Sequence, residues 1–337
     1  MSSGSYMAQP VLLVNIPKSK GGVRQLGIPS VSDRVAQMVV KNRLATIVEG
    51  KFHSDSYAYR PHKSAIDAVT VCRKRCFKYE WLLEIDIKGY FDHLDHNIMM
   101  DLLMKHTDDK VILLYSERFL KAPAIDAVGT YLERNKGTPQ GGVVSPILSN
   151  LYLHEAFDSW MQEKFSGIKF ERYADDIVVH CASERQAYFM KNRIEEQLQY
   201  YQLQLNEEKT RVVYTGTKNA YDKRKHKLSR KFNFLGYDFK PRVWHEKLVF
   251  TPGIGIGALK KIRHQIKEQW SLKSKISGSL GNIAKEVDVQ IRGWIEYYGH
   301  HRRSELYKLA YMIDYYLTRF IKIRVRLTTH GVKLGGD

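Results

Sequence analysis

The sequence has few cysteines and no long apolar run. Its three cysteines, Cys72, Cys76 and Cys181, are an odd number and include no Cys-x-x-Cys pair. This pattern argues against a disulfide framework and a structural zinc site, and it is typical of a reducing compartment. The apolar runs are too short to span a membrane, and residues 1–9 lack the apolar core of a signal peptide. We therefore expect a cytoplasmic protein with no membrane partner.

Negative charge is also scarce. Lys and Arg together number 54 against 36 Asp and Glu, which gives a formal net charge of +18. Such an excess predicts a polyanionic partner, and the common one is nucleic acid. The 337 residues are 43% hydrophobic, which is enough for a large core and long enough for two or three subdomains. Residues 241–337 hold 18 Lys and Arg and 8 Asp and Glu, so 18 − 8 = +10 of the charge lies in the last third.

Acidic residues follow two separate apolar runs. Asp175 and Asp176 stand between an aromatic run and a β-branched run, which predicts a hairpin with the acids near its tip. The run Trp81–Ile85 delivers Asp86 at its end. An Asp-Asp pair by itself is more often a polar turn. If the two strands lie side by side, however, Asp86 and Asp175 converge and a cation site becomes the better interpretation.

The chemistry that needs such convergence is nucleotidyl transfer. Two divalent ions ~4 Å apart deprotonate a 3′-hydroxyl and stabilise charge on the phosphate and on the leaving pyrophosphate. Mg²⁺ prefers oxygen ligands, and a few carboxylates together with substrate phosphates suffice. We therefore predict a site for two Mg²⁺ ions, with Mn²⁺ able to substitute. Its ligands are Asp86, Asp175, Asp176 and the carbonyl of Ile87.

Three blocks resemble the ordered signature blocks of a reverse transcriptase. They are Asp-Ile-Lys-Gly-Tyr-Phe-Asp at 86–92, Gly-Thr-Pro-Gln-Gly-Gly-Val-Val-Ser-Pro at 137–146 and Tyr-Ala-Asp-Asp at 173–176. Their order and spacing are most similar to those of reverse transcriptases encoded by bacterial group II introns, and the resemblance extends over nearly the whole chain.

This resemblance implies an α+β fold of the right-hand polymerase type. Fingers and palm would share antiparallel sheet flanked by helices, followed by an α-helical thumb. The expected divisions are fingers at 1–80, palm at 81–240 with a finger-helix insertion at about 93–136, and a thumb or maturase-like RNA-binding region at 241–337. By comparison with full-length members of the family, we expect the chain to lack an N-terminal extension. Because the sequence contains no pair of cysteines with a His-Asn cluster, we also expect it to lack the endonuclease domain of some relatives.

The resemblance also implies nucleotide-binding residues. Residues 11–17 and 23–29 predict a β-hairpin with a basic turn, and Lys18 and Arg24 have the spacing of the triphosphate contacts of the family. Phe91 would be the ring that excludes a 2′-hydroxyl, and core packing is its alternative. Gln140 would contact the incoming nucleotide. Lys209 would protonate or stabilise the pyrophosphate, with a plain surface lysine as the alternative.

Other positions are candidates for binding primer and template. Leu235, Gly236 and Tyr237 resemble the primer grip, although the segment also fits an ordinary strand. Arg60 is equally a template contact or a structural arginine. The remaining nucleic-acid contacts belong to a basic segment at 218–231, whose alternative is a solvated loop, and to the helices of the last third. They are Lys223, Arg224, Lys225, Lys260, Arg263 and Arg319.

Apolar periodicity predicts the helices. The first spans residues 32–47 with Ser32 as its N-cap. The others are expected at 64–79, 97–122, 146–160, 184–201, 258–270, 283–298 and 304–327.

The favoured function is an RNA-directed DNA polymerase of group II intron type, which extends a DNA or RNA primer on an RNA template with dNTPs. It would also bind group II intron RNA and assist splicing and mobility. The alternative from another class is an RNA-binding splicing maturase with little or no polymerase activity. A third reading is an RNA polymerase, against which Phe91 argues. Oligomeric state stays open.

Overall fold

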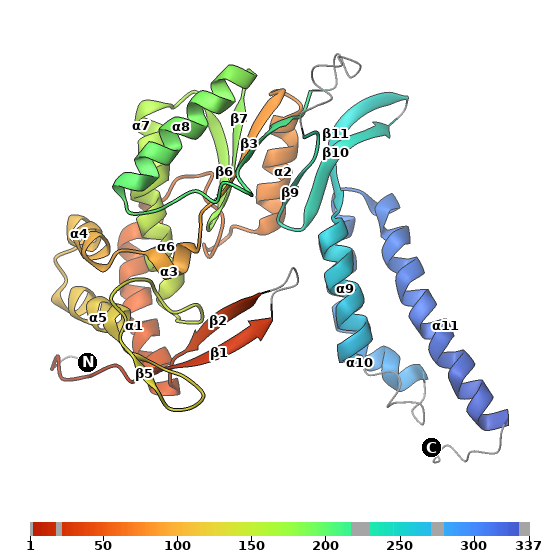
Figure 1. Cartoon of the computed structure of the whole chain (residues 1–337), viewed down its shortest axis with the longest axis horizontal. Helices are drawn as coiled ribbons and strands as arrows, with labels where there is room; N and C mark the ends of the chain where they lie inside the picture. Colours follow the sequence, from red (N-terminus) through yellow and green to blue (C-terminus); the bar gives the residue numbers. More distant parts are fainter. Residues whose placement is uncertain (1–2, 18–21, 217–228, 245, 271–279, 330–337) are drawn as a thin grey trace. The chain divides into compact units, whose positions relative to one another are not determined.

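The computed structural model describes residues 3–17, 22–216, 229–244, 246–270 and 280–329. The chain divides into two compact units, Met1–Ser229 and Arg230–Asp337 (Figure 1). The sequence placed a division at 240, which falls within a strand of the second unit. None of the helices within the described ranges is both long and apolar enough to cross a lipid bilayer.

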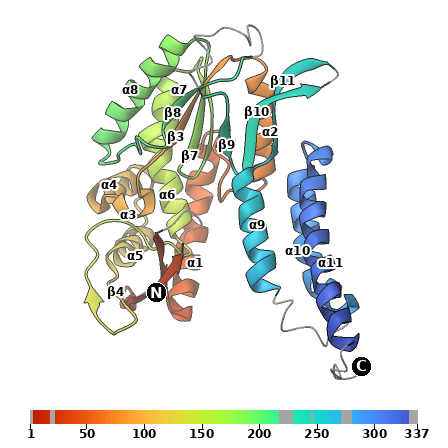
Figure 2. The ribbon, with the colours of Figure 1, turned by 45° about the vertical axis from the view of Figure 1, so that its right-hand side comes forward.

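The first unit is organised around a four-stranded sheet that we call the central sheet. Its strand order is β6-β7-β3-β8, and every neighbouring pair is antiparallel. The strands are β3 (Trp81–Asp86), β6 (Lys169–Tyr173), β7 (Asp176–Cys181) and β8 (Arg211–Tyr214). Figure 2 shows β8 beside β3 at one edge of this sheet. The hairpin expected around the two aspartates is therefore present as β6 and β7.

Helices pack on both faces of the central sheet, because each face carries buried side chains. Side chains alternate between the faces of a strand, and Leu83, Ile85 and Val179 join the large buried cluster to which α8 also contributes. On the other face Leu82 and Val178 are fully buried, and α2 packs against β6 and β7. The helices of this unit are α1 (Val31–Val48), α2 (Ala65–Cys76), α3 (Tyr90–His93), α4 (His96–His106), α5 (Lys110–Lys121), α6 (Ser145–Leu153), α7 (Trp160–Lys164) and α8 (Glu184–Tyr200).

A second sheet in this unit begins with the predicted N-terminal hairpin. Its order is β2-β1-β4-β5, with β1 and β4 parallel. The strands are β1 (Val11–Pro17), β2 (Val23–Ile28), β4 (Ala124–Ile125) and β5 (Tyr131–Leu132).

The second unit combines a three-stranded antiparallel sheet with three helices. The sheet order is β11-β10-β9, formed by β9 (Phe232–Phe234), β10 (Tyr237–Trp244) and β11 (Lys247–Ile254). The helices are α9 (Ile256–Gln269), α10 (Leu280–Gly299) and α11 (Tyr307–Thr329), preceded by a 3₁₀ turn at Arg303–Leu306. Ile262, Ile266, Val287 and Leu309 share one buried cluster, which holds the three helices together.

Two helix expectations need correction. Helix α1 is capped by Ser30, whose hydroxyl oxygen accepts from the Asp33 N–H, and not by Ser32. The stretch 97–122 forms two helices because Asp109 caps α5 through the N–H groups of Val111 and Ile112. In both places a side chain that accepts backbone N–H groups sets the start of the helix. The helix expected at 146–160 continues through a π-helical turn at His154–Ser159.

Candidate functional site

The register of the central sheet places Asp86 opposite Asp176. In the antiparallel pair of β3 and β7, Trp81 pairs with Cys181, and the ladder ends with Asp86 beside Asp176. Residues directly opposite each other point to the same face of a sheet, with Cβ atoms about 5 Å apart. The two carboxylates therefore lie on one face, where Glu84 also points. The convergence expected from two separate acidic strand ends is present.

Asp175 lies in the turn that joins β6 to β7. Tyr173 pairs with Asp176, which leaves a turn of two residues, Ala174 and Asp175. Ala174 has a φ of +57°, a conformation that glycine usually supplies in such turns. The turn is tight because only two residues connect the strands, so Asp175 is held next to the Asp86–Asp176 pair.

The electrostatics show that these acids crowd one another. Burial, together with the charges of Asp175, Asp86 and Glu84, raises the pKa of Asp176 to about 7, and the Lys209 charge opposes this effect. Burial and the Asp86 charge also raise the pKa of Asp175, while Arg24 and Lys209 oppose this effect. A raised carboxyl pKa means that the ionised form is disfavoured where it stands. A bound cation would stabilise that ionised form.

Lys209 lies directly on the acidic cluster. Its Nζ is 3.0 Å from Asp86 Oδ1 and 2.9 Å from Asp86 Oδ2. The segment before it is fixed to the end of β3, since the Lys88 N–H donates to the Gln204 carbonyl and the Asn206 N–H to the Asp86 carbonyl. These two hydrogen bonds form a β-bridge between Ile87 and Leu205, and neither of them uses the Ile87 carbonyl. The bridge therefore leaves the Ile87 carbonyl oxygen available as a metal ligand.

The donor set suits a hard divalent cation, although its atoms are not gathered to one point. The three aspartates and the Ile87 carbonyl offer only oxygen, which Mg²⁺ and Mn²⁺ accept. Their ligand atoms do not form a group with all members within 4.8 Å of one another. Binding a cation would thus require Lys209 to release Asp86 and the carboxylates to close in.

One buried group among the described residues does meet that distance, and it is Cys72, Glu171 and His180. Both Glu171 oxygens are already engaged. Arg75 Nη1 lies 2.7 Å from Oε1, and His180 Nε2 lies 2.7 Å from Oε2. Burial and the hydrogen bond with Cys76 raise the pKa of the Cys72 thiol well above its ordinary range, so a thiolate ligand is disfavoured. We interpret this group as a buried ion-pair network between α2 and the central sheet.

Phe91 and Gln140 lie on two segments that hydrogen-bond to each other. The loop 137–142 is fixed on one side by the Thr138 N–H, which donates to the Phe91 carbonyl at 2.7 Å. On the other side the Gln140 carbonyl accepts from the Gly27 N–H of β2 at 3.1 Å. The Gln140 side chain donates to Asp92 Oδ1 at 3.2 Å. The loop approaches so closely that a Cβ at Gly137 would lie 2.9 Å from the Phe91 and Asp92 carbonyl oxygens.

Phe91 is only partly buried, and its ring contacts Tyr90 edge-on with centroids 5.5 Å apart. Arg24 is exposed on β2 and acts electrostatically on Asp175. The structure thus places Lys209 on Asp86 and Arg24 within electrostatic reach of Asp175, and it joins the loop of Gln140 to the segment of Phe91 and Asp92. Lys18, the partner expected for Arg24, lies outside the described residues, as do Lys223, Arg224 and Lys225.

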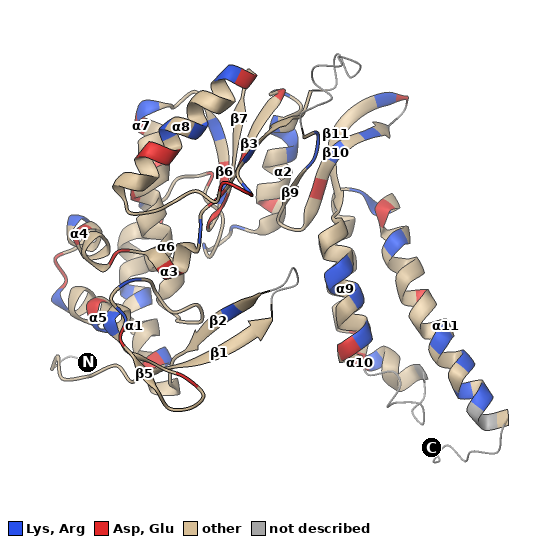
Figure 3. Ribbon diagram, viewed as in Figure 1, with Lys and Arg blue, Asp and Glu red and all other residues tan. Residues whose placement is uncertain are grey.

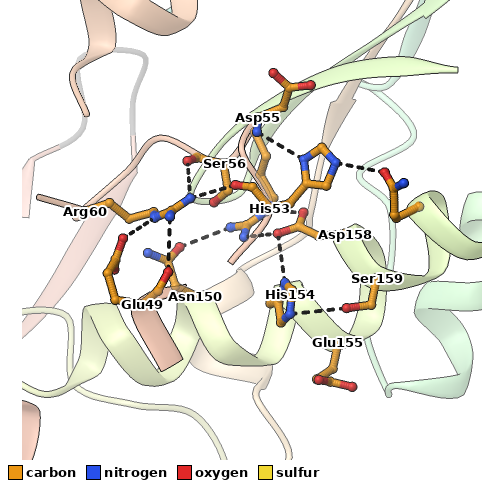
Figure 4. Close-up of polar contacts among 12 residues, drawn as sticks. Glu49, His53, Asp55, Ser56, Arg60, Asn150, His154, Glu155, Asp158 and Ser159 are labelled. Carbon is orange, nitrogen blue, oxygen red and sulfur yellow. Dashed lines mark hydrogen bonds and ion pairs between the residues drawn. The ribbon is translucent and has the colours of Figure 1, made fainter. Parts of the chain in front are cut away.

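A buried arginine that the sequence did not predict holds the turn of Ala174 and Asp175. Arg172 on β6 is fully buried, and its guanidinium binds Asp158 through two contacts of 2.8 and 2.6 Å. Its Nη1 also donates to Asn150 Oδ1 at 3.1 Å and to the Ala174 carbonyl at 3.4 Å. Figure 4 shows Asn150 and Asp158 projecting from the helix beneath the loop. The signal in the sequence was two adjacent charges, Glu171 and Arg172, next to the apolar Phe170 inside a predicted strand.

Arg60 supports the structural alternative rather than a template contact. Its Nε donates to Glu49 Oε1 at 2.7 Å, and its Nη1 donates to the carbonyls of His53 and Ser56 (Figure 4). Nη2 reaches the Glu49 carbonyl, and the side chain is only 8% exposed. Because each guanidinium nitrogen has a partner in the protein, we correct the expectation of a phosphate or base contact.

The residues expected to form the primer grip make the β9–β10 turn of the second unit. Leu235 and Gly236 have φ values of +52° and +84°. Tyr237 begins β10 and is fully buried, and its hydroxyl donates to the Tyr297 carbonyl. The Tyr297 hydroxyl in turn donates to the Leu235 carbonyl at 2.7 Å. The Tyr237 ring therefore belongs to the core of the second unit, and only Leu235 and Gly236 are accessible.

The basic candidates of the second unit are exposed on two of its helices, and Arg263 Nε donates to the Tyr316 hydroxyl of α11 at 3.2 Å. Lys260 and Arg263 are exposed on α9, and Arg319 is exposed on α11. Figure 3 shows Lys and Arg recurring along both helices. On α11 the exposed rings of Tyr307, Tyr311 and Tyr315 follow at intervals of four residues, so they share a face with the basic residues that follow.

The comparisons with known proteins agree with this geometry. The model of the reverse transcriptase (RNA-dependent DNA polymerase) family matches residues 16–239, more than half of the chain, and the chain belongs to this family. That membership implies dependence on a divalent metal ion in general terms. A second model, the group II intron maturase-specific domain, matches residues 259–333.

Relatives place the chain further within the family. It is 35% identical over 168 residues to protein YkfC of Escherichia coli, covering 48% of this chain and 44% of that protein. It is 35% identical over 173 residues to the group II intron-encoded protein LtrA of Lactococcus lactis, covering 51% and 28%. The putative COX1/OXI3 intron 1 protein of Saccharomyces cerevisiae is 32% identical over 163 residues, covering 48% and 19%. These matches confirm the resemblance to group II intron-encoded proteins, and each spans less than half of the relative.

Solved structures confirm the fold class. Telomerase from Candida albicans, solved with a fragment of telomeric RNA, has a TM-score of 0.55 at 13% identity, covering 95% of this chain and 60% of that one. Apo telomerase from Candida tropicalis has a TM-score of 0.54 at 14% identity, covering 94% and 64%. At these identities the likeness concerns the fold alone, and it supports the expected α+β polymerase architecture.

Proposed function

We propose that this protein is an RNA-directed DNA polymerase that extends a primer 3′-hydroxyl on an RNA template. The observation that carries the proposal is the strand register that sets Asp86 opposite Asp176, with Asp175 in the adjoining turn. A cluster of three carboxylates in which the pKa values of Asp175 and Asp176 are raised has little structural value. It suits a site for divalent cations, and the family assignment makes polymerisation the fitting reaction.

In this proposal Asp86, Asp175, Asp176 and the Ile87 carbonyl hold two Mg²⁺ ions, which Mn²⁺ can replace. The ions would supply charge stabilisation and activation of the primer hydroxyl. The ammonium group of Lys209 already lies at the cluster, where it contacts Asp86. In this proposal it leaves Asp86 and stabilises or protonates the departing pyrophosphate. Gln140 and Phe91 lie together against the incoming nucleotide, and the partly exposed Phe91 ring would fill the space of a 2′-hydroxyl.

Arg24 would bind the triphosphate, because it is exposed on β2 and its charge acts on Asp175. The proposal keeps the division into fingers, palm and thumb, and it keeps a cytoplasmic location, which rests on the cysteine pattern. Leu235 and Gly236 would contact the primer through the backbone of their turn.

The second unit is proposed to bind group II intron RNA and to assist splicing and mobility. The match to the maturase-specific domain and the basic, tyrosine-bearing face of α11 support this part. Folded RNA is bound largely through phosphates, 2′-hydroxyls and stacking on aromatic rings. The alternative of a maturase without polymerase activity would leave the acidic cluster without a role.

Primer extension on an RNA template with dNTPs and Mg²⁺ tests the proposal. We expect the wild type to extend, and Asp175→Asn to lose about a thousandfold in rate, because metal-ion charge stabilisation is worth several kcal/mol. Asp101→Asn is the matched control, since Asp101 is an exposed acid on α4. RNA affinity should be the same in all three proteins.

Two results would change the conclusion. A wild type that binds RNA but never extends a primer would leave the maturase alternative. A wild type that extends equally well with ribonucleotides would favour an RNA polymerase. In the same assay Phe91→Ala should admit ribonucleotides, and unchanged sugar discrimination would remove the role of Phe91.

A further inference from the structure

The last turn of α2 carries a group of cations around an exposed ring. Residues 68–79 hold four Lys or Arg side chains and no acid, and Figure 3 shows Lys and Arg in this turn. From there the chain leads into β3 at Trp81, whereas Asp86 lies at the opposite end of that strand. At ~3.3 Å per residue the two ends of β3 are about 17 Å apart. The group therefore lies outside the acidic cluster.

One of the four cations is used inside the protein. Arg75 Nη1 donates to the Phe170 carbonyl and to Glu171 Oε1, each at 2.7 Å. Its Nη2 binds Asp55 Oδ2 at 2.8 Å, and the Arg75 carbonyl accepts from the Lys78 N–H at 2.8 Å. These contacts fasten the end of α2 to β6, so the neighbouring side chains stand on a fixed support.

The other three cations have no partner of this kind. Within the described parts of the chain, Arg73, Lys74 and Lys78 form no ion pair and no side-chain hydrogen bond. Lys74 and Lys78 are exposed, and the Arg73 Nε atom is buried without a hydrogen-bond partner. The helix dipole favours cations in a last turn. That effect accounts for their sign but not for the exposed ring among them.

The exposed ring is that of Phe77, the C-cap residue of α2. It is 55% exposed, and the guanidinium carbon of Arg73 lies 5.8 Å from the ring centre. Arg73 and Phe77 are four residues apart, so they share one face of the helix, and Lys74 and Lys78 each follow one of them in the sequence. The end of α2 therefore offers a flat ring with unpaired cations beside it.

This combination suits a nucleic-acid strand. Phosphates bind Lys and Arg side chains whatever the base sequence, and an unpaired base stacks on an aromatic ring. An acidic peptide would use the cations and leave the ring exposed. RNA is favoured over DNA because unpaired bases in loops and bulges are the usual targets of proteins that bind folded RNA. The match to the maturase-specific domain supports an RNA partner as well.

We propose that the end of α2 binds folded RNA, with an unpaired base stacked on Phe77 and the adjoining phosphates on Arg73, Lys74 and Lys78. We call these four residues the α2 surface. It adds an RNA contact on the first unit to the one proposed for the second. The inference rests on the proposed function only in its choice of RNA as partner, and it does not involve the polymerase reaction.

The first test measures the affinity for a labelled RNA stem-loop at several salt concentrations. The combined variant Arg73→Gln/Lys74→Gln/Lys78→Gln should bind more weakly, and its slope of log affinity against log salt should be smaller by about 2, because each phosphate contact contributes ~0.7–0.9. Phe77→Ala should lose roughly 5- to 150-fold in affinity for the stem-loop and nothing for a fully paired RNA duplex. Phe77→Tyr keeps the ring and should bind as the wild type does.

Helix α8 supplies the matched control. Arg185 and Phe189 have the same four-residue spacing as Arg73 and Phe77, and Phe189 is 51% exposed. On α8, however, acids are as numerous as cations, and the Phe189 ring packs edge-on against Phe165. Arg185→Gln/Phe189→Ala should therefore leave the affinity and its salt dependence unchanged.

The second test locates the contact. A photoreactive thiouridine in the loop of the RNA should cross-link to residues 73–78 of the wild type, as identified by mass spectrometry. Phe77→Ala should lose this cross-link, and the α8 variant should keep it.

Equal affinity and equal salt dependence of the α2 and α8 variants would overturn the inference, as would cross-links confined to other segments. A DNA stem-loop that binds as tightly and shows the same losses would overturn the choice of RNA. Primer extension on an unstructured template should be unchanged in the α2 variants. If the wild type does not extend at all, the proposed polymerase function fails, and the binding and cross-linking results still decide whether the α2 surface binds RNA.

Discussion

Two hairpin turns of this chain have the same length and both begin with a residue in the left-handed region, yet their surroundings differ. The β6–β7 turn contains Ala174 at φ +57° and Asp175, and the β9–β10 turn contains Leu235 at φ +52° and Gly236. In the first turn the next residue is Asp176, beside Asp86 of β3. In the second it is Tyr237, which is buried and bonded to α10. We call them the acidic turn and the buried turn.

The comparison teaches that a turn becomes a site through residues distant in sequence. Both turns place a residue other than glycine in the left-handed region, which is uncommon. The acidic turn is held by Arg172 from below and faces carboxylates of another strand. The buried turn is held by the Tyr297 hydroxyl, which donates to the Leu235 carbonyl. Backbone strain therefore marks both turns, and charge distinguishes them.

The largest expected difference between the two turns should follow from removing the side chain that supports the acidic turn. Arg172→Met would leave Asp158 buried without its partner, which typically costs about 3–5 kcal/mol. Amide hydrogen exchange of peptides from β6 and β7 should accelerate strongly, while peptides from β9 and β10 stay protected.

The matched control for this substitution is Arg193→Met. Arg193 forms an ion pair with Glu196 on the exposed surface of α8, and such pairs are worth ~1 kcal/mol or less. If Arg172→Met exchanged no faster than Arg193→Met, the support that we assign to Arg172 would be wrong.

A second expected effect is a pH dependence of stability and of cation affinity that comes from Asp176, next to the acidic turn. The folded protein raises the pKa of Asp176 from its ordinary 3.8 to about 7, so the native state binds more protons than the unfolded state between these values. Stability without metal should therefore fall as pH rises through 7. Cation binding needs the ionised form, so below pH 7 its affinity should fall by about tenfold per unit.

Thermal unfolding at pH 5.5, 6.5 and 7.5, with and without Mg²⁺, measures both trends. Asp176→Asn should remove most of the pH dependence and raise the melting temperature without metal at pH 7.5, because a like charge is lost. A Mg²⁺ effect that is the same at all three pH values would contradict the assignment of Asp176.

The smallest expected effects come from exchanging alanine and glycine between the turns. Gly236→Ala should destabilise the protein by about 1–2 kcal/mol, because its φ is +84° and the new Cβ would lie 3.2 Å from the Tyr298 hydroxyl. Ala174→Gly should change stability by less than about 1 kcal/mol, since relief of strain offsets the gain in unfolded-chain entropy.

The activity of these two variants separates the roles of the turns. Primer extension should fall with Ala174→Gly, because a looser turn no longer fixes Asp175, and RNA affinity should be unchanged. Equal extension by Ala174→Gly and the wild type would show that the turn backbone does not matter for the site.

The sequence predicted the elements that carry the acidic turn because their patterns are local. Two apolar runs ending in Asp86 and before Asp176 indicated two strands, and the family blocks indicated that they pair. The hairpin at β1 and β2 and the long helices followed from periodicity in the same way. Lys209 contacts Asp86, and the roles of Phe91 and Gln140 stay predictions.

What the sequence did not predict depends on contacts between distant residues. Arg60 reads as a basic residue in a loop, and only the positions of Glu49 and of the His53 carbonyl show that it is structural. The Arg172–Asp158 pair joins a strand to a helix. Tyr237 fits an exposed grip and a core position equally well until α10 is placed against it.

The most direct test of the central claim is Mn²⁺ binding followed by electron paramagnetic resonance. The free-ion signal should decrease when the wild type is added, and Asp86→Asn and Asp175→Asn should each weaken binding by about tenfold or more, because each removes a ligand charge. Asp101→Asn should bind as the wild type does. Unchanged affinity in both site variants would show that Asp86 and Asp175, although brought together by β3 and the β6–β7 hairpin, are not parts of one metal site.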